Sequence, residues 1–196
     1  MLVFDHRLHN VPIMSLQTGT RLASTDQPII DPANLRIVAY EVEGPLLHQR
    51  PTFLRTDDIR EIGKIGIIVN GNDDFVGLDD VIKIKELHNL HFQLIGFKVI
   101  DEHKRRLGKV IAYTIDTSNF YVQQLDVRQG FIKGIADTGH LIHRTQIIEI
   151  NNSYIIVKSP AVKSEEPVMQ TIRSEFVNPF RNTKPQPNPE SMAEPS

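Results

Sequence analysis

Short apolar runs separated by turn residues fill most of the chain, and this pattern is typical of short β-strands. Two stretches share one pattern: IIDPANLRIVAY begins at residue 29, and TIDTSNFYVQQL begins at residue 114. Each consists of an apolar run, an Asp, two small turn residues, an Asn and a second apolar run. The Asp and the small residues favour a type I turn, with the Asn placed to adopt a left-handed conformation. Each stretch therefore predicts a β-hairpin corner.

The similarity of the two corners extends into an internal repeat. Leu22 aligns with Leu107 at an offset of 85 residues, and GIIV from Gly66 aligns with YIIV from Tyr154 at an offset of 88. A period of this length that occurs twice indicates a tandem pair of domains rather than a solenoid.

The strand after the second corner changes its buried face midway. Phe120 and Val122 share one parity, whereas Leu125 and Val127 share the other. Such a change indicates a β-bulge or a sharp bend, which allows a small sheet to curl on itself. Each copy is therefore predicted to form a small, strongly bent β-barrel.

These patterns predict an all-β protein in four parts. The parts are a first barrel (1–70), an acidic and partly helical linker (71–92), a second barrel (93–163) and a Pro-rich tail (164–196). In the linker, the apolar spacing from Leu78 to Leu87 predicts a short amphipathic helix. Asp79 and Asp80 would lie in its first turn, where acidic side chains interact favourably with the helix dipole.

The tail contains six of the twelve prolines of the chain and no glycine, so it is expected to be disordered. It includes one apolar island with Phe176 and Phe180. This island is a candidate docking motif that folds on a partner. Packing of the island against its own barrel, or a linker without function, are the alternatives.

Longer motifs carry a family resemblance. The first copy contains IMSLQTGTRLA from Ile13 and IIDP from Ile29, and the second contains VIDEHKRRLGKV from Val99 followed by Ile115 and Asp116. These motifs resemble the PRC-barrel family, which includes the H subunit of photosynthetic reaction centres and the C-terminal domain of the ribosome maturation factor for the small subunit.

The resemblance covers most of residues 11–70 and 93–160. It implies a small six-stranded β-barrel that binds proteins or RNA–protein assemblies, and it supplies no catalytic residues. The first copy departs from the family pattern at Ala23, where glycine is usual, so its tight bend is expected to be altered.

Composition narrows the class of protein. The chain has no cysteine, which excludes disulfides and thiolate metal sites and fits a reducing compartment. No apolar run approaches the roughly 18–20 residues of a membrane helix, and the first residues do not form a secretory signal. We therefore expect a soluble, cytoplasmic protein without membrane insertion.

The charge is unevenly distributed although the net charge is only −2. Residues 93–163 contain ten Lys and Arg against six Asp and Glu, so an anionic contact is expected there. The candidate partner-binding residues in this region are Lys104, Arg105, Arg106 and Lys109. The alternative is a solvated charged turn that protects a sheet edge from pairing.

Three His-x-x-His pairs invite a metal hypothesis: His6 with His9, His88 with His91, and His140 with His143. In a strand, however, residues i and i+3 point to opposite faces, and no cysteine contributes a ligand. No metal or cofactor is predicted. The sequence also has no Gly-rich phosphate loop, nucleophile elbow or HExxH motif, so no enzyme is expected.

The sequence therefore predicts a non-catalytic protein-interaction module or adaptor. An RNA-associated factor in ribosome maturation is the alternative, supported by the basic second copy. A metal-binding sensor is a remote third hypothesis, and homodimerisation is left open.

Overall fold

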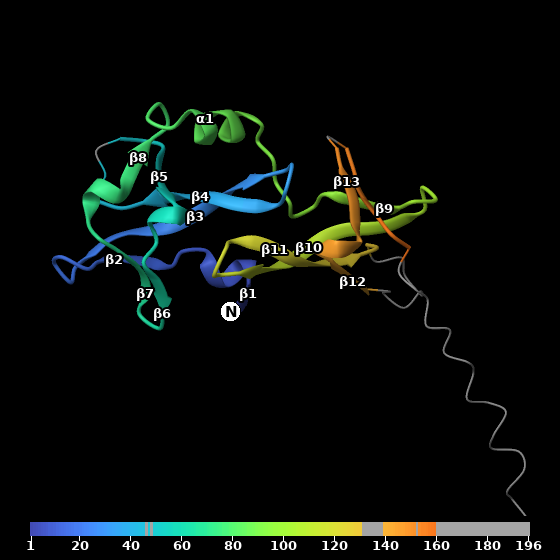
Figure 1. Ribbon diagram of the computed structural model, residues 1–196, viewed down its shortest axis with the longest axis horizontal. Coiled ribbons are helices and arrows are strands. Elements are labelled where there is room, and N and C mark those ends of the chain that lie inside the picture. Colours follow the sequence, from blue (N-terminus) through green and yellow to red (C-terminus); the bar gives the residue numbers. More distant parts are fainter. Residues whose placement is uncertain (46, 48, 131–138, 152, 160–196) are drawn as a thin grey trace, which may run out of the picture. The chain divides into compact units, whose positions relative to one another are not determined.

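The computed structural model describes residues 1–45, 47, 49–130, 139–151 and 153–159. Within them the protein is mainly β, as predicted, with fourteen strands and one α-helix (Figure 1). The first copy contains β2 (Pro12–Ser15), β3 (Arg21–Asp31), β4 (Arg36–Glu43), β5 (Thr52–Arg55), β6 (Glu61–Gly63) and β7 (Gly66–Val69). The second contains β9 (Lys98–Asp101), β10 (Arg106–Asp116), β11 (Tyr121–Arg128), β12 (Gly139–His143), β13 (Ile147–Ile150) and β14 (Ile155–Val157). The remaining elements are β1 (Leu2–Phe4), β8 (Phe75–Gly77), α1 (Ile82–Asn89) and the 3-10 helices η1 (Asp5–Leu8), η2 (Thr56–Asp58), η3 (Asn72–Asp74) and η4 (Arg144–Gln146).

The two copies repeat one order of strand pairing. Antiparallel ladders join β2, β3, β4 and β5 in the first copy, and β9, β10, β11 and β12 in the second. Each copy also has one parallel pair, β2 with β7 and β9 with β14, followed by an antiparallel hairpin. Among the described strands the ladders form one branched sheet that does not close, so the two closed barrels remain a prediction.

The two predicted corners pair with each other. Arg36 of β4 lies opposite Tyr121 of β11, and these residues are equivalent in the repeat. Ile37 donates its N–H to the carbonyl oxygen of Phe120 at 2.9 Å, and the equivalent Val122 donates to Leu35 at 3.0 Å. The contact is therefore self-complementary, like the interface of a two-fold symmetric dimer. The chain builds the same corner twice, and the corners join its two copies.

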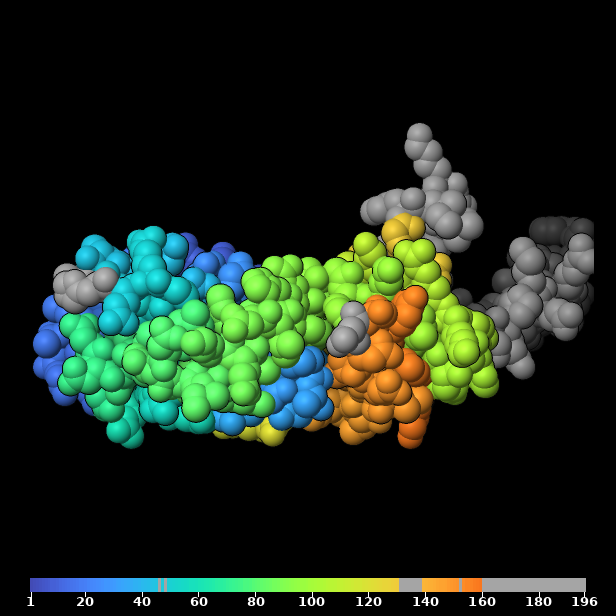
Figure 2. Space-filling model, turned by 90° about the horizontal axis from the view of Figure 1, so that it is seen from above, coloured from blue at the N-terminus to red at the C-terminus, as the bar shows by residue number. Residues whose placement is uncertain are grey.

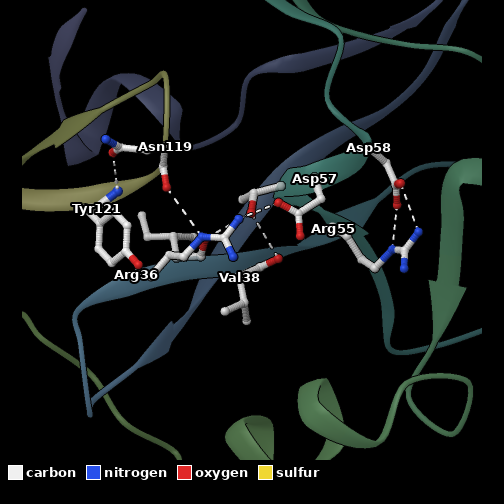
Figure 3. Close-up of polar contacts among 9 residues, drawn as sticks. Arg36, Val38, Arg55, Asp57, Asp58, Asn119 and Tyr121 are labelled. Carbon is white, nitrogen blue, oxygen red and sulfur yellow. Dashed lines mark hydrogen bonds and ion pairs between the residues drawn. The ribbon is translucent and has the colours of Figure 1, made fainter.

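Arginine side chains reinforce this junction from both sides. Arg36 donates to the carbonyl oxygen of Asn119 at 3.4 Å and forms an ion pair with Asp57 (Figure 3). In the opposite direction, Arg144 donates to the carbonyl oxygen of Asn34 at 3.2 Å and lies 4.5 Å from the centre of the Tyr121 ring. The carbonyls of two equivalent asparagines thus each accept a hydrogen bond from the other copy.

One hydrophobic core crosses the junction. Leu35 and Ile37 of the first copy are buried in the same cluster as Phe120, Val122 and many side chains of the second. Full burial of such a side chain contributes about 1.5–3 kcal/mol, against about 1 kcal/mol for each hydrogen bond. Burial therefore supplies most of the stability of the junction, and the hydrogen bonds set its register.

Further contacts tie the copies together. β1 pairs with the end of β10, and the N-terminal ammonium lies 3.1 Å from Asp116. In Figure 2 the first corner, in blue, lies beside the orange strands of the second copy, in agreement with the Arg144–Asn34 hydrogen bond. The described residues, which end at Ser159, accordingly belong to one compact unit. The predicted boundaries between linker and barrels stay predictions.

The corners differ from their prediction in one detail. The left-handed residues are Leu35 and Phe120, with φ of 55° and 58°, and not Asn34 and Asn119. Each Asn side chain instead accepts a hydrogen bond from the backbone N–H two residues later, which closes a local Asx turn. The predicted bulge is confirmed, because the register between β10 and β11 shifts between Thr114 and Ile115.

The helix begins four residues later than predicted. Asp80 accepts a hydrogen bond from the N–H of Gly77 at 2.6 Å, and this turn competes with helix formation at Leu78–Asp80. From Ile82 the helix α1 buries Ile84 and Leu87 in the apolar cluster formed with Phe53. No helix of the described residues is long and apolar enough to cross a membrane.

In each copy a glycine lies where two paired strands approach closely. In the second copy the glycine is on the first strand of the pair, and in the first copy it directly follows the second strand. A Cβ on Gly108 (φ 141°) would lie 2.1 Å from the carbonyl oxygen of Arg128. The first copy has Ala23 at the position of Gly108, and the glycine there is Gly44, directly after the facing strand β4. A Cβ on Gly44 would lie 2.7 Å from the carbonyl oxygen of Leu22 and 3.2 Å from the Cβ of Ala23. The alanine at position 23, where the family pattern has glycine, is thus compensated by Gly44 on the other side of the strand pair.

We expect Gly108→Ala to lower the free energy of unfolding by about 2–4 kcal/mol, because alanine is strained at this φ and its Cβ meets backbone. Urea unfolding monitored by circular dichroism measures the effect. Gly130→Ala is the matched control, since a Cβ there meets no atom of the described residues within 4 Å, and it should stay within about 0.5 kcal/mol of the parent. Equal stability of the two variants would contradict the close crossing at Gly108.

Candidate interaction surface

The predicted basic residues lie on one hairpin of the second copy. Lys104 and Arg105 form the turn between β9 and β10, and Arg106 and Lys109 lie on β10. All four are exposed. The predicted tail residues Phe176 and Phe180 lie outside the described residues.

A buried carboxylate holds this hairpin in shape. Asp101 Oδ1 accepts the backbone N–H groups of His103 and Arg105 at 2.9 and 2.8 Å, and Oδ2 accepts Arg105 Nε at 2.6 Å. Ser159 Oγ adds a further hydrogen bond at 3.2 Å. Burial alone would raise the pKa of Asp101, but the hydrogen bonds from Arg105 and His103 outweigh it and lower the pKa. The guanidinium of Arg105 therefore has a structural role, although the side chain remains exposed.

A row of three cations crosses the sheet next to this hairpin. Lys98 of β9 lies opposite Lys109 of β10, which lies opposite Arg128 of β11. We call Lys98, Lys109 and Arg128 the basic row. All three are exposed, and Arg128 Nη2 lies 3.5 Å from Asp126 Oδ2. Like charges directly opposite each other on one face repel, so an anion bound to the row would relieve the repulsion.

An aromatic ring, that of Tyr154 directly before β14, borders the basic row. The ammonium of Lys98 lies 5.8 Å from the centre of the Tyr154 ring, within the range of a cation–π interaction. The ring and the ammonium therefore orient each other at the edge of the row.

The first copy provides an internal comparison, because it builds the same row from other residues. Pro12 lies opposite Ser24, and Ser24 lies opposite Glu43. These positions correspond to Lys98, Lys109 and Arg128 in the strand pairing. The scaffold is the same in both copies, so the basic row is not required by the fold.

Two exposed aliphatic side chains lie beside the basic row. Ile111 of β10 is 44% exposed and Leu141 of β12 is 65% exposed. Leu141 is paired with Asp126, two residues from Arg128, and therefore shares its face of the sheet. The outer face of β9–β12 thus combines positive charge with apolar surface.

The sequence prediction includes one residue of the basic row, Lys109, and leaves out the others. Lys109 is a predicted binding residue, whereas Lys98 and Tyr154 are not. The register between neighbouring strands brings these residues together, and the sequence of one strand does not show that register. The repeat alignment carried the missing signal, since it places Lys109 against Ser24 and Tyr154 against Gly66.

The histidine pairs do not assemble into a metal site within the described residues. His88 and His91 have ring centroids 5.9 Å apart, and His143 bonds to Thr145 Oγ1 at 2.9 Å. No group of three or more His, Asp or Glu side chains among the described residues could hold a metal ion.

Comparison of the sequence with protein-family models and with curated proteins found no match.

The contribution of Asp101 to stability should depend on pH. A lowered pKa in the folded state gives stability that is present above the ordinary carboxyl pKa of 3.8 and is lost as the pH falls through the folded value. We therefore expect Asp101→Asn to unfold more easily than the parent at pH 7, with the difference shrinking below about pH 4. Thermal unfolding between pH 2.5 and 7 measures this.

Asp73→Asn, which changes an exposed carboxylate, is the control and should match the parent at every pH. A stability difference for Asp101→Asn that is the same at pH 2.5 and pH 7 would contradict the electrostatic role of Asp101.

Proposed function

We propose that the protein is a non-catalytic interaction module whose second copy binds an acidic segment of a protein partner. The basic row carries this proposal, because the two copies share one scaffold and only the second presents Lys98, Lys109 and Arg128 on it. In this proposal the first copy acts as a rigid support that is fixed to the second by the paired corners.

Charge complementarity supports an anionic partner. Strands in a sheet lie about 4.8 Å apart, so the three cations of the row extend over about 10 Å. Carboxylates spaced along an acidic chain can reach such a row and remove the repulsion between Lys98 and Lys109. Exposed ion pairs of this kind contribute chiefly to orientation and association rate, and the adjacent apolar contacts add affinity.

The composition of the surface favours a protein over RNA. Ile111 and Leu141 offer apolar contacts of the type found at the centre of protein interfaces. Single-stranded RNA binds to aromatic side chains with free faces, and the ring of Tyr154 already has the ammonium of Lys98 at 5.8 Å from its centre. The chain as a whole has a net charge of −2 and a pI near 6.4, whereas nucleic-acid-binding domains are usually strongly basic.

The resemblance to PRC-barrels supports the same proposal. Each copy is proposed to be a PRC-like barrel, and the family uses this barrel for binding rather than for catalysis. The cysteine-free sequence fits a reducing compartment such as the cytoplasm.

The test uses the double variant Lys98→Gln/Lys109→Gln. We expect its free energy of unfolding to be equal to or up to about 0.5 kcal/mol above that of the parent, because the opposed charges are removed. We expect its affinity for an acidic peptide of alternating Glu and Leu to fall at least about tenfold. Fluorescence anisotropy with the labelled peptide at low salt measures the affinity, and urea unfolding measures the stability.

Arg21→Gln/Lys64→Gln is the matched control, because it removes two exposed cations from the first copy and changes the net charge equally. It should leave peptide affinity unchanged. Equal losses in both double variants would reduce the effect to net charge and contradict a site at the basic row. Tighter binding of a single-stranded RNA of equal length, lost in the same variant, would replace the proposal with the RNA-associated alternative.

A further inference from the structure

One strand edge is covered in the first copy and open in the second. In the first copy β5 pairs with β4 on one side and with β8 on the other, so both of its edges are paired (Figure 1). The equivalent strand of the second copy is β12, and among the described strands it pairs with β11 alone. The outer edges of β6 and β13 are open in both copies within the described residues, whereas the edge of β12 distinguishes the second copy from the first.

The strand pairing shows which residues of the two edges correspond. Phe53 of β5 lies opposite Glu41 of β4, and Leu141 of β12 lies opposite Asp126 of β11. Glu41 and Asp126 are equivalent in the repeat, at an offset of 85 residues. Leu141 therefore takes the place in the second copy that Phe53 has in the first.

The side chains at these two positions differ in burial. Phe53 is fully buried, because β8 and α1 supply Val76, Ile84 and Leu87 to its apolar cluster. Leu141 is 65% exposed. Full burial of such a side chain contributes about 1.5–3 kcal/mol, so Leu141 offers a contact that the first copy makes within its own chain.

The backbone of Leu141 points to the open edge. The N–H of His143 donates to Gln146 Oε1 at 2.8 Å, so it is not directed at β11. Since N–H groups two residues apart in a strand point to the same side, Leu141 directs its N–H and C=O away from β11. An edge with free backbone groups is a template on which another strand can pair.

We propose that the open edge of β12 binds an extended segment of a protein partner as an added antiparallel strand. The first copy shows the arrangement, because β8 runs antiparallel to β5 and places Val76 opposite Phe53. The partner strand correspondingly places an apolar, β-branched residue opposite Leu141. Its main-chain hydrogen bonds supply affinity, and the pairing with Leu141 supplies selectivity.

This contact goes beyond the binding of an acidic segment. It shares Leu141 with the outer face of β9–β12, but it uses no residue of the basic row. The bound segment is recognised by its extended backbone and its apolar side chain, and not by its charge.

Hydrogen exchange of the free protein compares the two equivalent amides. We expect the amide of Phe53, which faces β8, to exchange at least about 100-fold more slowly than that of Leu141. Equal protection of the two amides in a monomeric protein would mean that the chain itself already pairs this edge, and would overturn the proposal. A dimer in sedimentation equilibrium that Leu141→Thr dissociates would assign the edge to a second copy and would also overturn it.

The binding probe is a capped peptide with the sequence of residues 72–80, which contains β8. It is titrated into the full chain, and the backbone amide signal of Leu141 is followed in ¹H–¹⁵N NMR spectra. We expect this signal to shift and to saturate at millimolar peptide, the affinity of a short unstructured segment. No shift at Leu141, or shifts confined to β5, would contradict binding at β12.

N-methylation of the peptide tests strand pairing directly. In β8 the N–H of Phe75 donates to the carbonyl oxygen of Asn72, so the N–H of the next residue, Val76, faces β5. Methylation at Val76 should therefore weaken binding at least about tenfold, whereas methylation at Phe75 should change it less than about threefold. Equal effects of the two methyl groups would overturn the added strand.

Leu141→Thr tests the side-chain contact and should weaken peptide binding about fivefold. Ile65→Thr is the matched control, because Ile65 is 68% exposed and lies in the first copy, and it should bind like the parent. Both variants should keep their stability within about 0.5 kcal/mol of the parent, since both side chains are exposed.

Lys98→Gln/Lys109→Gln separates this site from the basic row. At 0.5 M salt, where exposed charges are screened, the double variant should bind the peptide within about threefold of the parent. Loss of binding in this variant, without any effect of methylation at Val76, would place the peptide on the basic row. That result would overturn the added strand and leave the proposed function intact.

Discussion

Two backbone hydrogen bonds between equivalent corners determine how the two halves of this protein sit against each other. Ile37 and Val122 each donate to the residue that precedes the other's strand, so the junction is self-complementary. The hydrogen bonds contribute only about 2 kcal/mol together, and the buried side chains around them contribute more. Their importance lies in register, because a shift by one residue would turn Ile37 and Val122 away from the shared core.

This shared scaffold makes differences between the copies informative. Where both copies have the same residue types, as in the Asp and Asn of the corners, the side chains form turns and hold the fold together. Where they differ, the difference is not dictated by strand pairing. The basic row replaces Pro12, Ser24 and Glu43 with three cations on an equivalent part of the sheet, at some cost in repulsion. Among the described strands, β12 likewise keeps open an edge that β8 covers on β5.

Local features of the fold could be predicted from the sequence, and features that depend on contact between distant residues could not. The corners and the bulge near Val122 follow from patterns within about ten residues, and the repeat follows from the similarity of stretches 85 and 88 residues apart. The pairing of one corner with the other has no such local signature, although it joins the two most similar stretches of the chain. The left-handed Leu35 and Phe120 were missed for a related reason, since burial in the shared core stabilises a conformation that their residue types disfavour. At the candidate site, Lys109 was identified from charge alone, whereas Lys98 and Tyr154 required the strand register.

We infer that the paired corners make the two copies a single folding unit. Native-state hydrogen exchange of the amides of Ile37 and Val122 tests it most directly, because these two N–H groups form the junction. We expect both amides to exchange only through global unfolding, with the same free energy as core amides such as those of Val42 and Val127. Exchange of Ile37 and Val122 through a local opening, while both cores stay protected, would contradict it.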